Sequence, residues 1–241
     1  MEPGAQWETP ARPASPVRWG IGDFFYVYFA GLLASAVGAA VGAVLSDQQP
    51  DDPTTALTLG CAIAALYGAY TAVLFLISRL KGRGSLRADF GVAVQARYWW
   101  ALLAGFALQF VLGALVLPLI TLVDNEKQSV VEELKDSSGA KLAVLILTAG
   151  LLAPVFEEIL FRGLLLRSLR RRLSVEWAIA IQALVFSVAH LTDPSLGTLA
   201  VVPALFALGA ISGIAAVRTG DLSISIPLHV GFNLVTVLVL R

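Results

Sequence analysis

Three charged residues lie close together inside an apolar stretch of this sequence. Glu157, Glu158 and Arg162 are set among Val, Phe, Ile and Leu side chains in residues 154–166. A charged residue at the centre of a membrane-spanning helix costs about 2.5–3.5 kcal/mol, whereas each Leu or Ile favours insertion by only about 0.3–0.6 kcal/mol. Ionisable residues at such depth are rare and tend to be functional. The cluster is therefore the first candidate functional site.

A helical conformation divides these three charges between two faces. Glu158 and Arg162 are four residues apart, so they share a face and can form an ion pair, with the acid in the favourable first position. Glu157 is rotated by about 100° from that face and has no partner in its own helix. We expect the pair to fix the helix and Glu157 to be the reactive carboxylate. Pro154 lacks a backbone donor, which predicts a kink beside the cluster.

The two histidines of the chain also lie in apolar segments, each with a notable residue one helical turn away. Phe186 precedes His190 by four residues, and Asn233 follows His229 by four. A histidine in a spanning helix is often only an interhelical contact, and a buried Glu with an Arg is often a structural pair. Each motif alone fits structure as well as function. Because the apolar interior carries little else that ionises, their concentration favours a common site.

The composition is that of a polytopic membrane protein. Hydrophobic residues make up 57% of the chain and charged residues 14%, with a mean hydropathy of +0.79. Soluble proteins contain roughly 45–50% apolar and about 25% charged residues. A net charge of zero without a long basic run argues against nucleic acid as a partner. The single cysteine, Cys61, excludes an intramolecular disulfide framework.

The hydropathy pattern predicts an all-α fold, a transmembrane bundle of about seven helices. Most of the seven apolar runs approach the ~20 residues that a membrane span needs. They are residues 21–45, 55–78, 98–123, 141–166, 176–191, 196–217 and 222–240, the fifth being the shortest. Residues 1–19 contain four prolines among polar residues, which predicts a disordered tail. The membrane-embedded bundle would then span residues 20–241.

Basic residues predict that the N-terminus is cytoplasmic. With seven alternating helices, twelve basic residues fall on the inner side: Arg12, Arg18, Arg79, Lys81, Arg83, Arg87, Arg97, Arg167, Arg170, Arg171, Arg172 and Arg218. Four fall on the outer side: Lys127, Lys135, Lys141 and Arg241. This distribution satisfies the positive-inside rule. Trp19, Trp99, Trp100 and Trp177 fall at inner helix ends, where indole rings favour the headgroup level.

Pairs of glycines four residues apart predict close helix packing. Gly38 with Gly42, and Gly209 with Gly213, show the spacing of small residues that lets two membrane helices approach. The pattern is common in helical bundles, so we interpret it as structural.

Three motifs together resemble the signature of the CPBP family of intramembrane proteases, also called the CAAX protease and bacteriocin-processing family. They are Glu-Glu-x-x-x-Arg at 157–162, Phe-x-x-x-His at 186–190 and His-x-x-x-Asn at 229–233. The resemblance covers residues 141–241, which would form the catalytic core. It implies a water-filled cavity open to the cytoplasm, in which a membrane-associated protein or peptide is cleaved near its C-terminus.

The resemblance also implies the roles of the motif residues. The catalytic residues would be Glu157, Glu158, His190, His229 and Asn233, and among them Glu158 would support the other four. Arg162 and Phe186 would orient the site.

Two mechanisms are open for these residues. In the first, Glu157 assisted by His190 deprotonates a water, while His229 and Asn233 donate hydrogen bonds to the oxyanion. In the second, His190 and His229 with Glu157 or Glu158 hold Zn²⁺, and the other glutamate is the base. The family is often labelled metalloprotease, although members resembling this chain have been interpreted as glutamate-type peptidases. No His-Glu-x-x-His spacing is present, and three ligands would have to come from three helices. We favour the first mechanism, with Zn²⁺ as an optional cofactor.

Two other classes of function could use the same residues. A non-catalytic scaffold or a bacteriocin self-immunity protein would use the charged cluster to stabilise a bundle that binds a partner. A proton-coupled transporter would also bury Glu, Arg and His, but no internal repeat is visible in the sequence. We expect an integral plasma-membrane peptidase whose partners are membrane lipid and a membrane-associated substrate.

Overall fold

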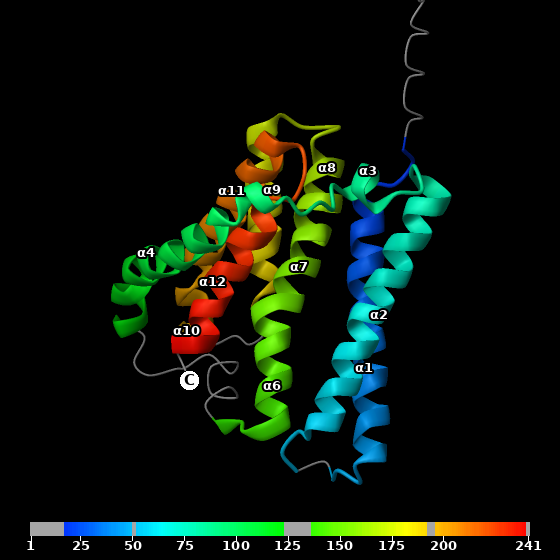
Figure 1. The fold of residues 1–241 in the computed structure, drawn as a ribbon, viewed down its shortest axis with the longest axis vertical. Helices are drawn as coiled ribbons and strands as arrows, with labels where there is room; N and C mark the ends of the chain where they lie inside the picture. The colour runs from blue at the N-terminus through cyan, green and yellow to red at the C-terminus, as the bar shows by residue number, and fades with distance from the viewer. Residues whose placement is uncertain (1–16, 50–51, 123–135, 192–195, 240–241) are drawn as a thin grey trace, which may run out of the picture.

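The described part of the protein is entirely helical. A computed structural model describes residues 17–49, 52–122, 136–191 and 196–239, and these ranges contain helices and connecting segments without a strand. Figure 1 shows a hairpin of two long helices beside a central helix, with the short helix α3 (Leu86–Phe90) at the upper end of the hairpin and most other helices on the opposite side of the central helix. The all-α prediction is confirmed.

The helical hairpin consists of α1 (Ile21–Leu45) and α2 (Ala56–Lys81), which lie side by side over most of their length. Small residues allow this approach, since a Cβ atom at Gly38 would collide with the carbonyl oxygen of Cys61. A Cβ atom at Gly42 would collide with Thr58 in the same way. The close packing predicted from the glycine spacing is therefore present.

The central helix carries the acidic motif and contains two π-helical segments. It runs through α6 (Gly139–Leu147), a π-helical segment η2 (Thr148–Leu152), α7 (Ala153–Glu157), a second π-helical segment η3 (Glu158–Leu166) and α8 (Arg167–Leu169). Pro154 is the second residue of α7, close to the end of the first π-helical segment, where its missing N–H leaves the regular helical hydrogen-bond ladder incomplete. The helix beside the cluster contains π-helical segments, and the predicted kink stays a prediction. All nine residues of η3 are buried.

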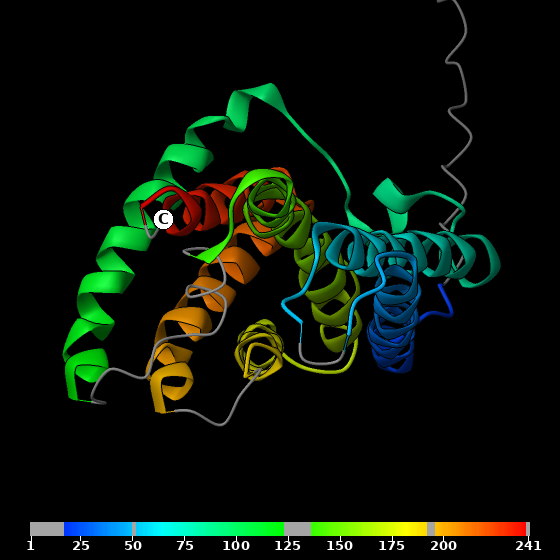
Figure 2. The same ribbon diagram turned by 90° about the horizontal axis from the view of Figure 1, so that it is seen from below.

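The second half of the bundle packs around the other side of the central helix (Figure 2). It contains α4 (Trp100–Leu122), α9 (Val175–Ala189), α10 (Leu196–Ala200), α11 (Val202–Thr219) and α12 (Ser225–Val239). Helix α12 crosses α4 closely, because Gly105 faces the backbone of Leu228 and Gly231 faces that of Leu102. Helix α11 lies against α9, where Gly209 meets Ala183. Two short helices, α3 (Leu86–Phe90) and the 3₁₀ turn η1 (Ala96–Tyr98), connect α2 to α4.

Five helical segments are long and apolar enough to cross a membrane. They are Ile21–Leu45, Ala56–Lys81, Ala96–Leu122, Gly139–Leu169 and Val202–Thr219. The other two predicted spans correspond to shorter apolar helices, Val175–Ala189 and Ser225–Leu238. The count of seven spanning helices stays a prediction.

The start of the described chain is packed against the bundle. Residues 1–16 of the predicted tail lie outside the described residues, but Trp19 is only 5% exposed. Its indole nitrogen donates to Asp89 Oδ1 at 3.2 Å, and its ring lies 5.6 Å from that of Phe90. The Trp19 ring is therefore buried against protein, whereas Trp99 and Trp177 are each 67% exposed. The headgroup-level position of these tryptophans stays a prediction.

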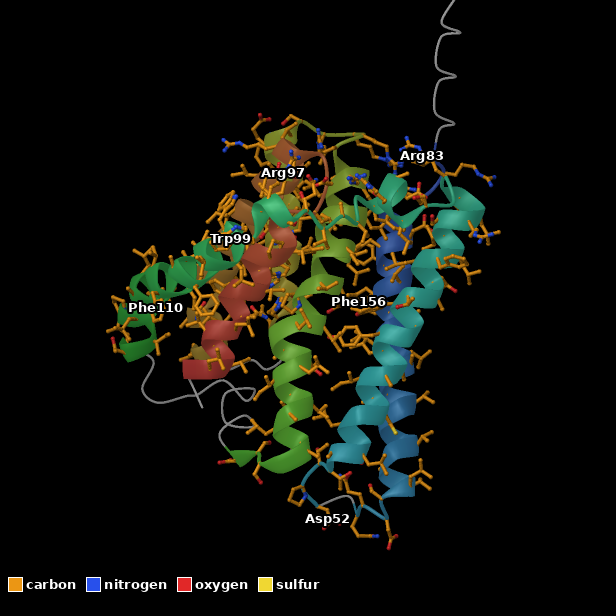
Figure 3. All side chains as sticks on the ribbon, in the orientation of Figure 1. Asp52, Arg83, Arg97, Trp99, Phe110 and Phe156 are labelled. Atoms are coloured by element: carbon orange, nitrogen blue, oxygen red, sulfur yellow. The ribbon has the colours of Figure 1, made fainter. Side chains whose placement is uncertain are left out.

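Basic and acidic residues mark opposite ends of the described bundle. Figure 3 shows Arg83 and Arg97 at one end and Asp52 at the other. Arg12, Lys127, Lys135 and Arg241 lie outside the described residues. Which membrane face each end meets stays a prediction.

Candidate active site

The predicted ion pair between Glu158 and Arg162 is present at the centre of the protein. Glu158 Oε1 lies 3.0 Å from Arg162 Nη1, and both side chains are fully buried. The guanidinium also donates from Nη2 to the carbonyl oxygen of Gly209 at 3.3 Å. It lies 4.5 Å above the ring of Phe186. A charge buried to this degree needs such compensation, and here it comes from helices α9 and α11.

Phe186 occupies the space between the charged cluster and both histidines. Its ring lies 4.5 Å from that of His190, 5.6 Å from that of His229 and 5.1 Å from that of Phe161, measured between ring centroids. The side chain is fully buried. Its position agrees with the orienting role that the family resemblance implies.

His229 is held by Glu158. Its Nδ1 lies 2.9 Å from Glu158 Oε1, and the ring is 2% exposed. Because a carboxylate accepts, Nδ1 carries the proton in this hydrogen bond. The opposite nitrogen, Nε2, points at Glu157 Oε2 across 3.6 Å. Glu158 therefore fixes both the ring position and the tautomer of His229.

His190 is oriented in the same manner by a backbone carbonyl. It stands directly after α9, and its Nδ1 donates to the carbonyl oxygen of Phe186 at 2.8 Å. Its Nε2 lies 3.6 Å from the same oxygen atom, Glu157 Oε2. The two histidines thus present their second nitrogens to one carboxylate oxygen.

Glu157 is the carboxylate that remains available. Its side chain is 23% exposed, compared with 0% for Glu158, and its Oε2 atom is buried without a hydrogen-bond partner in the described part of the chain. A separation of 3.6 Å is too long for a direct hydrogen bond to either histidine, and a water molecule can bridge such a gap. A carboxylate between two imidazoles that can accept or return a proton is suited to general acid–base chemistry.

Asn233 contacts the backbone of the central helix. No hydrogen bond joins its side chain to Glu157, His190 or His229 in the described structure. Its Nδ2 atom donates to the carbonyl oxygen of Ala149 in η2 at 2.8 Å. The contact joins α12 to the first π-helical segment. An amide nitrogen has two N–H donors, so one remains for another acceptor. The oxyanion role of Asn233 stays a prediction.

The π-helical winding at the site could not be foreseen from residue types. Glu157 ends α7 and Glu158 begins the π-helical segment η3. π turns are rare and occur frequently at functional sites. This change of winding sets the directions in which the two adjacent carboxylates leave the helix.

Gln182 is a further polar neighbour of the cluster. It lies one helical turn before Phe186, on the face that carries His190, which makes it a weak polar signal in the sequence. Gln182 is fully buried and donates to Gly209 O at 2.8 Å, so it shares this acceptor with Arg162.

Aromatic residues from the helical hairpin border the site as well. Tyr67 stacks on Phe156 with ring centroids 4.6 Å apart, and Tyr70 lies 6.1 Å from the same ring. Figure 3 shows Phe156 directed from the central helix toward α2. Tyr28, Tyr67 and Tyr70 all interact electrostatically with Glu157. The surroundings of Glu157 therefore extend beyond the core predicted at residues 141–241.

The donor set does not fit a zinc centre with three protein ligands. His190 and His229 offer suitable nitrogens, and Glu157 offers an oxygen. Glu158 is already bound by Arg162 and His229. Within the described ranges, no three His, Cys, Asp or Glu side chains form a cluster that could hold a metal ion. A catalytic zinc site needs three such ligands and an open position.

Comparison with known proteins finds a family that is similar to the region of the site. The profile of the type II CAAX prenyl endopeptidase Rce1-like family matches residues 139–235, which contain all seven candidate residues. An uncharacterized 24.3 kDa protein of Escherichia coli is 38% identical over 96 residues. That alignment covers 39% of this chain and 43% of the relative. No solved structure matches the chain significantly. Residues 139–235 are thus similar to the Rce1-like family of type II CAAX prenyl endopeptidases, and the alignment with the relative spans less than half of either chain.

Proposed function

We propose that this protein is a membrane-embedded endopeptidase that cleaves a membrane-associated substrate near its C-terminus. The observation that carries the proposal is the arrangement of Glu157 Oε2, a buried oxygen without a hydrogen-bond partner that two histidine nitrogens approach to 3.6 Å. Similarity to the Rce1-like family supports peptide hydrolysis as the reaction.

In the proposed reaction, Glu157 is the general base. A water in the space between Glu157 and His190 loses a proton to the carboxylate as its oxygen attacks the scissile carbonyl carbon. The proton then passes to the leaving amine, so that a carboxylate and a free amine are formed. His190 holds the water through Nε2, because its Nδ1 proton is engaged by Phe186 O.

The developing negative charge on the carbonyl oxygen would be stabilised from α12. His229 can donate from Nε2 when both ring nitrogens are protonated, because Nδ1 donates to Glu158 at the same time. The second N–H of Asn233 is the other proposed donor. Glu158 and Arg162 act through His229 and are positioning residues.

We further propose that the protein lies in the plasma membrane with its basic end toward the cytoplasm. Five apolar helices of sufficient length support membrane integration. The gathering of basic side chains at one end supports the orientation, since cytoplasmic loops are enriched in Lys and Arg.

Purified protein should hydrolyse members of a fluorogenic peptide library, and His190→Gln should lower the initial rate by about 10²-fold. The histidine stands at the end of α9 and its side chain is 31% exposed, so this change should leave thermal unfolding nearly unaltered. The assay uses full-length protein in detergent, with a lipidated peptide included in the library. Equal rates for the wild type and His190→Gln would remove the histidine from the mechanism. If no peptide, including the lipidated one, is cleaved, a scaffold role is favoured.

Chelation tests the alternative that involves zinc. Because His190, His229 and Glu157 do not form a cluster that could hold a metal ion in the described ranges, we expect the rate to stay within about twofold of its original value after dialysis against a chelator. Loss of activity on chelation and recovery with Zn²⁺ would show that the site rearranges to bind the metal.

A further inference from the structure

A cavity at the basic end of the bundle adjoins the candidate active site through Arg162. It has a volume of about 410 Å³ and lies between the start of the described chain, α3, α8 and the end of α11. Four arginines near the basic end of the protein line the cavity: Arg83, Arg167, Arg170 and Arg171. Neither Glu157 nor the two histidines contribute to its walls. Figure 3 shows Arg83 at this end of the protein, where nitrogen-bearing side chains gather.

Three of these arginines donate hydrogen bonds to backbone carbonyls. Arg167 donates to the carbonyl oxygens of Asp89 at 3.2 Å and Gly220 at 2.6 Å. Arg171 donates to the carbonyl oxygen of Trp19, and its guanidinium lies 4.4 Å above the Trp19 ring. Arg83 donates to the carbonyl oxygen of Ala88 at 3.2 Å. Such bonds fix the positions of the guanidinium groups without a direct ion pair, although Asp89 and Asp221 act electrostatically on Arg167 and Asp23 acts on Arg171.

The carboxylate in the cavity wall is fully engaged elsewhere. Asp89 is buried, and its two oxygens accept from Trp19 Nε1, Ser78 Oγ and the backbone N–H of Arg83. Within the described ranges, no carboxylate lies within ion-pair distance of the four arginines. Burial, followed by the neighbouring charge of Arg172, lowers the pKa of Arg171. The cavity therefore has an excess of positive charge.

The floor of the cavity is the fully buried Arg162. Its Nη1 pairs with Glu158, whereas its Nε is buried without a hydrogen-bond partner in the described structure. Leu166, Ala216 and Val217 supply an apolar wall beside it. The cavity thus combines a cationic mouth, an unsatisfied donor at depth and an apolar side.

We propose that this cavity binds a phosphate group, either that of an anionic phospholipid headgroup or that of a free phosphate. Planar guanidinium groups bind phosphate oxygens in pairs, and several of them converge here. The apolar wall suits the carbon chain of a phosphate ester. The cavity shares Arg162 with the Glu158 pair, so a bound phosphate would be connected to the acidic cluster through one side chain.

The proposal is tested by the thermal unfolding of full-length protein in phosphatidylcholine nanodiscs. One arm adds inorganic phosphate, with sodium chloride at the same ionic strength as its blank, and the other arm includes phosphatidylglycerol in the nanodisc. We expect Tm to rise by about 3 °C in at least one arm, because a ligand that binds the native state stabilises it. A rise in the first arm identifies free phosphate as sufficient, and a rise in the second alone identifies the lipid headgroup.

Matched charge variants distinguish the cavity from the basic surface. Arg83→Gln/Arg170→Gln removes two positive charges that line the cavity, and Arg87→Gln/Arg172→Gln removes two exposed charges at the same end that do not. The rise in Tm should disappear in the first variant and persist in the second. Native mass spectrometry of retained phosphatidylglycerol gives a binding readout that does not depend on unfolding. Absence of a rise in both arms, or an equal loss in the two variants, would overturn the proposal.

Discussion

Replacement of Glu157 by Gln is expected to lower peptide hydrolysis by about 10²–10⁴-fold, because an amide has nearly the same shape but cannot accept the proton of the attacking water. Thermal unfolding should remain near that of the wild type, since Glu157 Oε2 has no hydrogen-bond partner to lose within the described structure. The initial rate on a fluorogenic peptide and Tm, measured on one detergent preparation, check both parts.

A matched control separates this effect from a general effect of charge. Glu176→Gln changes an exposed glutamate at the start of α9 and should leave the rate unaltered. If Glu157→Gln prevents folding, Glu157 is a structural residue and its role as the base is wrong.

The largest loss of stability is expected from Arg162→Met, because it leaves the carboxylate of Glu158 buried without its cation. Breaking a buried pair by removing one partner typically costs about 3–5 kcal/mol. The side chain also loses its contacts with Gly209 O and the Phe186 ring. Unfolding of the variant by heat or denaturant in the same detergent measures the loss.

The double variant Glu158→Gln/Arg162→Met removes both charges and serves as the control. It should recover a large part of the stability lost in the single variant, because no unpaired carboxylate remains at position 158. A single variant with nearly wild-type stability would show that the Glu158–Arg162 pair does not fix the central helix.

The local part of this architecture could be predicted from the sequence. The first apolar run, residues 21–45, coincides with α1, and the helical repeat placed Glu158 and Arg162 within reach of each other. The glycine spacing predicted the close approach of α1 and α2. These features depend on residues a few positions apart in the sequence, and the helical period alone predicts which of those residues share a face.

Features that depend on distant residues could not be predicted in the same way. The carbonyl oxygens that hold His190, Asn233 and Arg171 belong to the backbone and leave no mark in the residue types. The burial of Trp19 depends on Asp89 and Phe90, which are about 70 residues away in the chain. The π-helical segments likewise reflect how the central helix fits its neighbours.

The central claim is that Glu157, with His190 and His229, forms a hydrolytic centre. Its most direct test is the initial rate per folded molecule for wild type and Glu157→Gln, measured with one cleaved peptide in the same lipid nanodiscs. We expect a rate at least about 10²-fold lower for the variant. A rate for Glu157→Gln within about twofold of the wild type would contradict the claim, because a general base contributes far more than that.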